Sequence, residues 1–515
     1  MTEFNWEEQA GRAIEQLLLF VVRKGLVETV DVPYCRNLLL DAMGMQAPGA
    51  SGAEDTGAET AGAILQTLCE LAVKRQLIGP LSVDRELFSV RLMGLLTPSP
   101  AEVRRRYRQD LAEGGPERAV TRFYEMCRAC DYIKVDAIAQ NLLFLEDTPA
   151  GQLEITINLS KPEKDPREIA KLKNAPPVGY PLCMLCVENP GYAGRANFPA
   201  RQNHRMVPLT LGGQSWYLQY SPYAYYPEHC IVLNSRHIPM KIDRGTFVRL
   251  FDFVRQVPHY FLGSNADLPI VGGSILNHDH FQGGNHVFPM DKAGLRTKLA
   301  APAAGVTAGI VDWPMTAVRL ESEDAEALIR LADDLLQAWR GWSDEALGIL
   351  AASEGVPHNT ITPILRRKAG RWCLTLVLRN NRTSDEHPLG IFHPHAELHH
   401  IKRENIGLIE VMGLFILPGR LKTELALLTP WLTGAEPLAE PEAADPRHKH
   451  YPWVCEILRR HGPCADTAAA EALLHHELGS VCAQVLADAG VYKADAAGQA
   501  GLLRFLEAQG YREDV

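Results

Sequence analysis

The chain has 515 residues, more than one hydrophobic core usually organises, and we therefore expect about two to four structural units. Its composition, with 46% hydrophobic and 22% charged residues, is typical of a globular enzyme. The formal charge of −10 argues against general nucleic-acid binding, which requires a basic face. If the substrates carry phosphate, basic side chains must be concentrated locally.

The first residues are acidic and lack the apolar core of a signal peptide, and no apolar run reaches the ~18 residues that cross a bilayer. We expect a cytoplasmic protein without membrane contact. Eleven cysteines, an odd number, indicate thiols or metal ligands rather than a disulfide framework. We interpret Cys127 and Cys130 as core packing, whereas Cys183 and Cys186 follow an irregular, proline-rich segment that suits a metal knuckle.

Residues 1–150 are predicted to be mainly helical. Apolar side chains recur near every 3.6 residues from Glu8 to Lys24 and from Ala101 to Leu142. The segment Ala47–Gly62, rich in small and acidic residues, predicts a mobile surface loop between helices.

Residues 151–304 are predicted to form a catalytic unit in which strands dominate. Alternating apolar residues predict the strands, and spacing near 3.6 predicts the helices. The predicted elements are a strand at Leu153–Leu159, a short helix at Asp165–Lys173, strands at Trp216–Tyr220 and Ile231–Leu233, and a helix at Thr246–Tyr260.

Residues 305–435 are predicted to form a second, degenerate copy of this unit. Trp372–Leu378 reads as a strand, and Phe392–Glu397 repeats a His-x-His pattern without a following glutamine. Helical spacing returns at Leu421–Leu432. Residues 436–515 are expected to begin with a linker rich in proline, alanine and glutamate and to end as a helical tail.

The segment Gly272–Gly284 contains the strongest candidates for catalytic residues. On a β-strand the side chains of His278, His280 and Gln282 would share one face, while Asp279 and Phe281 would point to the other. Neutral imidazole is a good nucleophile towards phosphorus, and an amide can donate to phosphoryl oxygens as their charge grows. This pattern indicates phosphoryl or nucleotidyl transfer.

The His-x-His-x-Gln pattern resembles the signature of the galactose-1-phosphate uridylyltransferases, a branch of the histidine-triad-like superfamily. Residues 153–166, 399–413 and 417–421 resemble signatures of the second, bacterial type of that family, and Phe123-Tyr124 and residues 131–133 extend the resemblance over most of the chain. The resemblance implies an α+β fold of two fused histidine-triad-like units, with a helical N-terminal region and a helical C-terminal tail.

The family resemblance also implies a reaction and residue roles. A UDP-glucose–hexose-1-phosphate uridylyltransferase exchanges UMP between UDP-glucose and galactose 1-phosphate in a ping-pong scheme, with His280 as the nucleophile that carries the uridylyl group. Gln282 and Ser274 would support the phosphoryl group, and Asn265 would contact uridine. Sugar and phosphate contacts are expected in the second unit. They are assigned to Lys402, Asn405 and Glu410 from their position alone, and a solvated helix start is the competing interpretation.

The resemblance further implies a structural zinc ion and no organic cofactor. The expected ligands are Cys183, Cys186, His229 and His278, two cysteines and two histidines that suit tetrahedral coordination. Reduced core thiols and a histidine in a turn are the alternative. A dense group of histidines offers a second candidate metal site, at His387, His393, His395, His399 and His400.

Two other functions share part of this pattern. A dinucleoside polyphosphate phosphorylase would use the same strand with adenine in place of uracil, and a zinc-stabilised nucleotide-sugar sensor would bind without turnover. Retention of His280 and Gln282 argues against the sensor, and neither a P-loop nor a Rossmann glycine motif occurs. The expected partners are small-molecule substrates, with no nucleic acid. A homodimer is compatible with the sequence, which does not fix the oligomeric state.

Overall fold

The protein is described by a computed structural model that covers all residues except 1–4, 50–51, 150, 161–177, 274 and 515. Its contacts divide the chain into two compact units, which interleave along the sequence. Unit 1 comprises residues 1–140 and 160–238, and unit 2 comprises residues 141–159 and 239–515. The four segments expected from the sequence were consecutive, so the short excursion of residues 141–159 into unit 2 was not anticipated.

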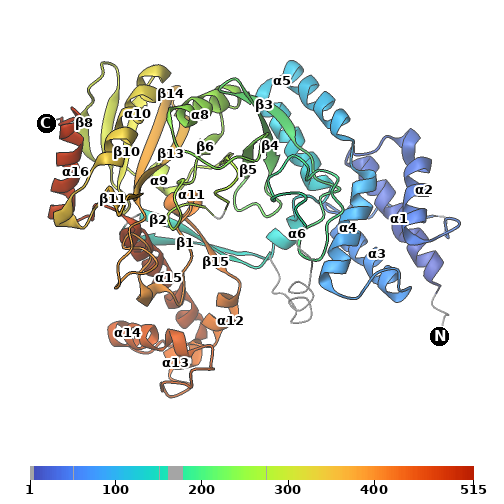
Figure 1. Ribbon diagram of the computed structural model, residues 1–515. Helices are drawn as coiled ribbons and strands as arrows, with labels where there is room; N and C mark the ends of the chain where they lie inside the picture. Colours follow the sequence, from blue (N-terminus) through green and yellow to red (C-terminus); the bar gives the residue numbers. More distant parts are fainter. Residues whose placement is uncertain (1–4, 50–51, 150, 161–177, 274, 515) are drawn as a thin grey trace. The chain divides into compact units, whose positions relative to one another are not determined.

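The N-terminal part of unit 1 is helical, as expected (Figure 1). Asn5 caps the first helix by accepting a hydrogen bond from the Glu8 amide, and Gly44 ends the second in the left-handed conformation. The helices are α1 (Trp6–Arg23), α2 (Val32–Met43), α3 (Gly62–Lys74), α4 (Ser82–Leu96), α5 (Pro100–Ala129) and α6 (Val135–Ile138).

Helix α5 lies in the region expected to be helical and consists of two arms. Gly115 interrupts it with φ 77° and ψ −176°, and Pro116 follows inside the helix. Proline lacks an amide hydrogen and clashes with the preceding turn, so the chain reverses here. Asp110 on the first arm pairs with Arg118 at 3.0 Å and Arg122 at 2.7 Å on the second. These ion pairs fasten the two arms together.

Unit 1 also contains an antiparallel strand set that confirms the expected strands after residue 206. The strands are β3 (Val207–Leu211), β4 (Gln214–Tyr220) and β5 (Cys230–Asn234), with β4 between the other two. The hydroxyl of Tyr220 donates to the carbonyl of Val120 at 2.8 Å, and its ring packs 5.3 Å from that of Phe123. Buried aromatic side chains therefore join this sheet to the second arm of α5.

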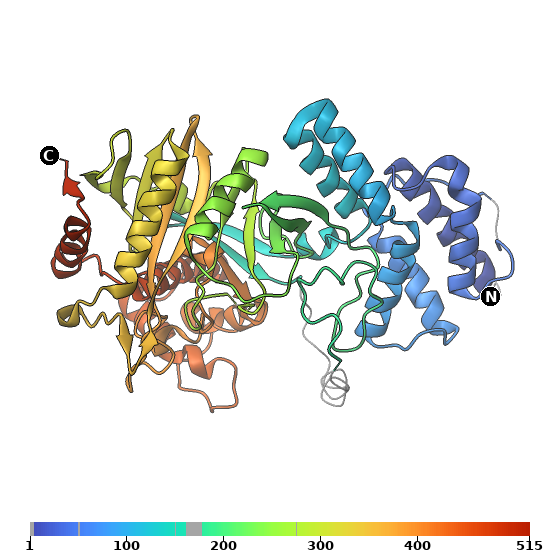
Figure 2. The same cartoon turned by 45° about the horizontal axis from the view of Figure 1, so that its top comes forward.

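The core of unit 2 is an antiparallel sheet with strand order β16-β8-β9-β10-β14-β13-β6-β7. Helices α8 (Arg244–Gln256) and α10 (Ala325–Gly341) pack beside each other against it, as Figure 2 shows. Asp243 and Asp324 cap these helices through their side chains. The strands are β6 (Phe261–Gly263), β7 (His280–Gly284), β8 (Leu295–Ala300), β9 (Thr307–Val311), β10 (Ala317–Ser322), β13 (Asn359–Lys368), β14 (Arg371–Asn380) and β16 (Arg512–Glu513).

A second, three-stranded sheet of unit 2 joins segments that are far apart in the sequence. The hairpin β1 (Leu142–Thr148) and β2 (Gly151–Asn158) is antiparallel, and β15 (Leu414–Pro418) pairs with β2 in parallel. Helix α15 (Thr467–Ala489) packs on the hairpin, where Phe144 stacks on His475 with ring centroids 4.2 Å apart. The predicted boundary near residue 150 therefore falls inside one hairpin.

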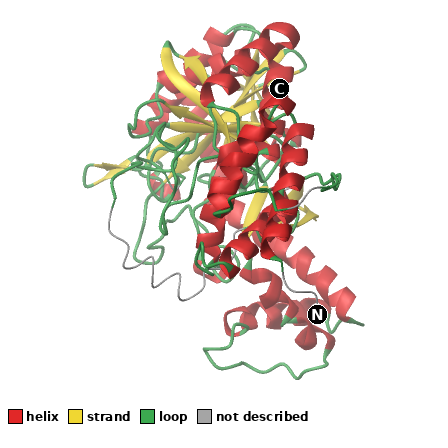
Figure 3. Ribbon diagram, turned by 90° about the vertical axis from the view of Figure 1, so that its right-hand side faces the viewer, coloured by secondary structure: helices red, strands yellow, loops and turns green. Residues whose placement is uncertain are grey.

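The remaining elements of unit 2 are short or C-terminal, and Figure 3 distinguishes the helices from the strands. The residues expected to form a tail are folded onto unit 2, because β16 pairs with β8 at the edge of the main sheet. These elements are α9 (Pro289–Lys292), β11 (Ala352–Ser353), β12 (Val356–Pro357), α11 (Leu408–Val411), α12 (Arg420–Ala426), α13 (Thr429–Thr433), α14 (Tyr451–His461) and α16 (Ala496–Ala508).

The α+β class is confirmed. Some secondary-structure elements differ from those expected from the sequence, and one expected helix lies outside the described residues. The segment with the repeated His-x-His pattern is not a strand: residues 392 and 393 form a turn and a bend, and a short 3-10 helix, Ala396–Leu398, follows. Pro394 has no amide hydrogen to offer a ladder, and its carbonyl oxygen accepts a hydrogen bond from Nε2 of His399 at 2.8 Å. The helix predicted at Asp165–Lys173 lies outside the described residues. No helix in the described ranges is long and apolar enough to cross a membrane.

Candidate active site and metal centre

The His-x-His-x-Gln residues lie at the start of β7 in unit 2. His280 opens the strand and Gln282 pairs with Gly263 of β6, whereas His278 precedes the strand in a bend. Strand alternation therefore applies to His280 and Gln282 and does not extend to His278. All three are wholly or partly buried, with His280 5% exposed.

The opposite face of this strand contacts helix α8. The guanidinium of Arg249 lies 4.0 Å from the Asp279 carboxylate and 6.0 Å from the centre of the Phe281 ring. Asp279 and Phe281 therefore point towards α8, which leaves the other face of the strand to His280 and Gln282. The expected opposition of His280 and Gln282 to Asp279 and Phe281 is therefore present, whereas the expected place of His278 on the same strand face is not, because His278 lies in a bend before β7.

One hydrogen bond fixes the tautomer of His280. Its Nδ1 lies 2.8 Å from the carbonyl oxygen of His278, and because a carbonyl oxygen only accepts, Nδ1 carries the hydrogen. Nε2 then holds a lone pair. Burial, aided by the charge of His278, lowers the pKa of His280 to about 4, although the bond to the His278 carbonyl opposes this. The ring is thus neutral near pH 7 and has a nucleophilic nitrogen.

Gln282 is partly buried beside this imidazole on the strand. Its Oε1 is buried and has no hydrogen-bond partner within the described chain. A buried amide without a full set of partners costs free energy unless a ligand group completes it. Ser274, the other predicted phosphoryl contact, lies outside the described residues.

Cys183 and Cys186 form a tight knuckle in unit 1. Their sulfur atoms are 3.5 Å apart, and the Leu185 amide donates to Sγ of Cys183. The side-chain amide of Asn189 donates to the carbonyls of both cysteines, at 2.9 and 2.8 Å, and so fixes the turn. Such a turn presents two thiols to one point in space, as a structural zinc site requires.

The histidine beside these thiols is His237. Its Nδ1 is 3.1 Å from Sγ of Cys186, and one ligand atom of each of the three residues lies within 4.8 Å of the others. His229, the ligand expected from the sequence, packs instead against Tyr226, with ring centroids 4.5 Å apart. His229 directly precedes β5 and His237 follows it. The family pattern favoured His229 as the ligand.

Three residues of unit 2 that were expected to contact substrates lie around the start of α11. Asn265 accepts a hydrogen bond from the Leu408 amide at 2.8 Å, and Glu410 accepts one from the Gly407 amide at 2.9 Å. Nζ of Lys402 lies 2.5 Å from Oε1 of Glu410. The structure thus brings Asn265, Lys402 and Glu410 together. Each of them makes at least one hydrogen bond within the protein.

Lys402 and Glu410 form a buried ion pair. Their side chains are 6% and 12% exposed. Burial lowers the pKa of Lys402, but the Glu410 carboxylate more than offsets this, and the net shift is upward. Asn405, the third residue expected here, is exposed.

Arg379 is a buried cation that the sequence analysis did not single out. It lies on β14, is 2% exposed, and donates from Nη2 to the Ile406 carbonyl at 3.0 Å. Its Nε and Nη1 have no hydrogen-bond partner in the described ranges. Burial lowers its pKa to about 10, against the effect of Glu410, so it remains charged at neutral pH. The sequence could have indicated this buried cation, because Arg379 lies near the end of a strand whose preceding residues are mostly apolar.

The histidine-dense segment forms a second group of potential metal ligands. His395, Glu397 and Asp488 each offer one ligand atom within 4.8 Å of the others. The His395 amide also donates to the Asp488 carboxylate at 3.1 Å, and Glu397 is exposed. These bonds explain the arrangement without a metal.

Comparison with known proteins gives consistent matches along the chain. The galactose-1-phosphate uridyl transferase N-terminal domain matches residues 58–239, and its C-terminal domain matches residues 253–429. A galactose-1-phosphate uridylyltransferase of Caldanaerobacter subterraneus subsp. tengcongensis is 49% identical over 98% of this chain and 99% of its own length. One from Bacillus subtilis is 44% identical over 96% of this chain and 97% of its own length.

Among solved structures, yeast Ap4A phosphorylase Apa2 is 14% identical, with a TM-score of 0.30, and the match covers 58% of this chain and 90% of that chain. The family assignment rests on the sequence matches, because they cover nearly the whole chain at high identity. The chain belongs to the galactose-1-phosphate uridylyltransferase family and is a nucleotidyltransferase.

Proposed function

We propose that this protein exchanges UMP between UDP-glucose and galactose 1-phosphate through a uridylyl group carried on His280. The relatives named above support the substrates. The observation that carries the mechanism is the bond from Nδ1 of His280 to the His278 carbonyl, which leaves the lone pair on Nε2. A neutral imidazole held in one tautomer is ready to attack phosphorus.

The reaction consists of two displacements. Nε2 of His280 attacks the α-phosphorus of UDP-glucose, a nitrogen–phosphorus bond forms, and the bond from that phosphorus to the bridging oxygen breaks. Glucose 1-phosphate leaves with the bonding electron pair. A phosphate oxygen of galactose 1-phosphate then attacks the same phosphorus, and UDP-galactose forms as the electron pair returns to Nε2. No proton transfer is needed, because both leaving groups are stable without one.

Labelling tests this mechanism directly. UDP-glucose labelled in the uridylyl phosphate should leave one acid-labile, alkali-stable label per active chain, and peptide mapping should locate it on His280. Added galactose 1-phosphate should release the label as UDP-galactose. Label on another residue would refute the role of His280, and transfer without any labelled enzyme would refute the ping-pong scheme.

In this proposal Gln282 donates to the phosphoryl oxygens as charge develops on them. Its position two residues from His280 on the same strand supports this role, because both side chains lie on one face of β7. Ser274, whose hydroxyl can donate a hydrogen bond, is a second proposed donor. Asn265 would contact the uridine side, and the segment with Lys402, Asn405 and Glu410 would hold the hexose phosphate.

Gln282→Ala should slow uridylyl transfer roughly 10²–10³-fold, the usual effect of losing one donor to a charged transition state. The thermal unfolding midpoint should change little, since no hydrogen bond to Oε1 would be lost. Single-turnover rates with saturating UDP-glucose provide the measurement. A variant that unfolds readily but reacts at the parent rate while folded would make Gln282 structural.

We further propose that Cys183, Cys186 and His237 hold a structural zinc ion. His278, expected as a ligand from the sequence, would be the fourth ligand by analogy with the family. Two thiolates and two imidazoles are a common tetrahedral set, and a zinc ion in it would support folding rather than activate water. Ligation of His278 would also restrain the carbonyl that sets the His280 tautomer.

About one zinc ion per chain should be found by elemental analysis of gently purified protein. His237→Asn should lower the zinc content, whereas His229→Asn should retain it, because His237 lies beside the Cys186 thiol and His229 packs against Tyr226. Cys183→Ser should reduce thermal stability more than the specific activity of the folded fraction, with Cys455→Ser as the matched thiol control. Full stability and activity in a zinc-free sample would sink the proposal.

A further inference from the structure

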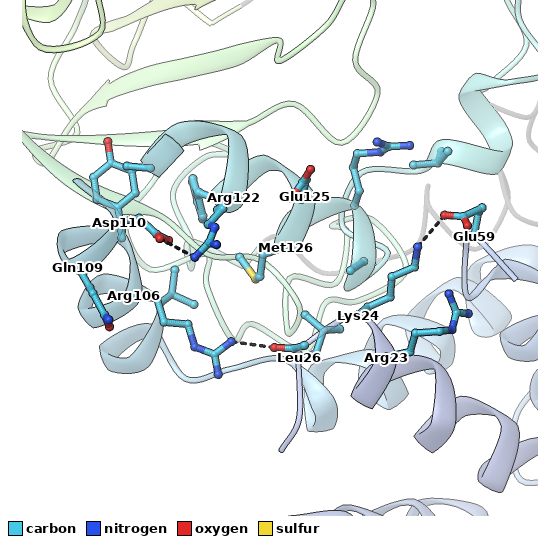
Figure 4. A pocket seen from close by; sticks show the side chains of 18 residues that line it. Arg23, Lys24, Leu26, Glu59, Arg106, Gln109, Asp110, Arg122, Glu125 and Met126 are labelled. Atoms are coloured by element: carbon cyan, nitrogen blue, oxygen red, sulfur yellow. Dashed lines mark hydrogen bonds and ion pairs between the residues drawn. The ribbon is translucent and has the colours of Figure 1, made fainter. Parts of the chain in front are cut away.

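Unit 1 contains a cavity that the transfer reaction does not use. Its volume is about 660 Å³, within the usual range for small-molecule sites. It lies between the two arms of α5 and is closed by residues 23–26 at the end of α1 (Figure 4). No residue of the His-x-His-x-Gln segment lines it, and the contribution from α1 precedes the matched family domain, which begins at residue 58.

The lining is basic although the chain as a whole is acidic. Five cationic side chains and three carboxylates line the cavity, in a chain with a net charge of −10. Two of the cations are also paired with carboxylates outside the lining, Arg106 with Glu102 at 2.5 Å and Arg23 with Asp55 at 2.8 Å. The guanidinium N–H groups that are not used in these pairs can still bind an anion. The cations are Arg23, Lys24, Arg106, Arg122 and Arg128, and the carboxylates are Glu59, Asp110 and Glu125.

Interactions within the unit hold the cations in place. Nη1 of Arg106 donates to the Gly25 carbonyl at 2.8 Å, and Arg122 pairs with Asp110 at 2.7 Å. Lys24 pairs with Glu59 at 2.7 Å from the other side of the cavity (Figure 4). Each arginine has five N–H donors, so both retain donors for a ligand. A restrained guanidinium loses less conformational entropy when it binds phosphate than a freely moving one.

The floor between these charges is apolar. Leu26, Val103 and Phe123 are almost fully buried there, and the ring of Tyr107 lies edge-on to that of Phe123, with centroids 6.3 Å apart. A planar ring can pack on such a surface while its charged part reaches the arginines. The cavity therefore combines the two kinds of contact that a nucleoside phosphate requires.

We propose that this cavity is a second ligand site, which binds a nucleotide through its phosphate groups. Arg106 and Arg122 bind the phosphate oxygens, and the base packs on the floor near Phe123. The ligand is not consumed, since the lining contains no nucleophile of the transfer reaction. Adenine and uracil nucleotides share this chemistry, and direct titration distinguishes them.

The test is calorimetric titration of the full-length protein with ADP, UDP and inorganic phosphate in turn. Arg122→Gln should weaken nucleotide binding at this site roughly ten- to a hundredfold, as expected for a charged hydrogen bond. Arg108→Gln removes the same charge from an exposed position on α5 outside the cavity and should bind like the parent. UDP should show two sites per chain, of which only one responds to Arg122→Gln.

Uridylyl transfer at saturating substrate should be unchanged in Arg122→Gln, which shows that the variant is folded and that the lost binding does not concern the transfer site. Phosphate should compete with the nucleotide, and higher salt should weaken binding, because the arginines are partly exposed. The proposal is overturned if neither ADP nor UDP binds in a way that depends on Arg122. It is equally overturned if Arg108→Gln has the same effect.

Discussion

Replacement of His280 by alanine should abolish uridylyl transfer and leave the protein folded. The only other polar side chain placed on that face of β7 is Gln282, and an amide cannot carry the uridylyl group. Neither formation of the labelled enzyme nor production of UDP-galactose should be detectable. Near-parent turnover in this variant would contradict the assignment of the nucleophile.

The control for this substitution lies on the same strand segment. Asp279→Asn changes the neighbouring residue, which faces Arg249 on α8, and should retain most of the transfer activity. His280→Gly with added imidazole offers a second check, because the vacated space can admit an external nucleophile. Free uridylyl-imidazole should then accumulate from UDP-glucose, and its absence together with parent-like labelling would point to another residue.

Loss of either partner of the Lys402–Glu410 pair should have the largest effect on stability. Removal of one member of a buried ion pair leaves an uncompensated charge and typically costs about 3–5 kcal/mol in the free energy of unfolding. Lys402→Met and Glu410→Leu should each show this loss in urea unfolding, whereas the double variant should recover much of it. Lys422→Met, at an exposed position, is the matched control.

The double variant also separates structure from substrate binding. If this pair holds the hexose phosphate, as we propose, the stable double variant should show a raised KM for galactose 1-phosphate and less change in labelling by UDP-glucose. Parent-like KM values for both hexose phosphates would mean that the pair only supports α11. The sugar site would then have to be sought elsewhere in the chain.

The sequence predicted the local elements well where one physical signal dominated. Apolar spacing was enough for α1, and strand alternation placed β2 and β4 within two residues of their observed bounds. The opposition of His280 to Asp279 also followed from alternation alone. These features depend on a few neighbouring residues, so no knowledge of the rest of the fold was needed.

The features that sequence reasoning missed depend on contacts between distant segments. The choice of His237 over His229 is decided by which end of β5 meets the Cys183–Cys186 knuckle, which periodicity cannot indicate. The pairing of Lys402 with Glu410 and the burial of Arg379 likewise arise from tertiary packing. The break in α5 could have been predicted, because the sequence Gly115-Pro116 disfavours a continuous helix. It was missed because apolar side chains recur with helical spacing on both sides of it.

The parallel pairing of β2 with β15 limits how this chain can be divided for expression. A fragment that starts at residue 253, where the matched C-terminal domain begins, would lack the hairpin of residues 142–158. Strand β15 has no other partner in its sheet, so its backbone donors and acceptors would be left without a ladder. Such a fragment should aggregate through this bare edge, and a separately supplied hairpin peptide should restore its solubility.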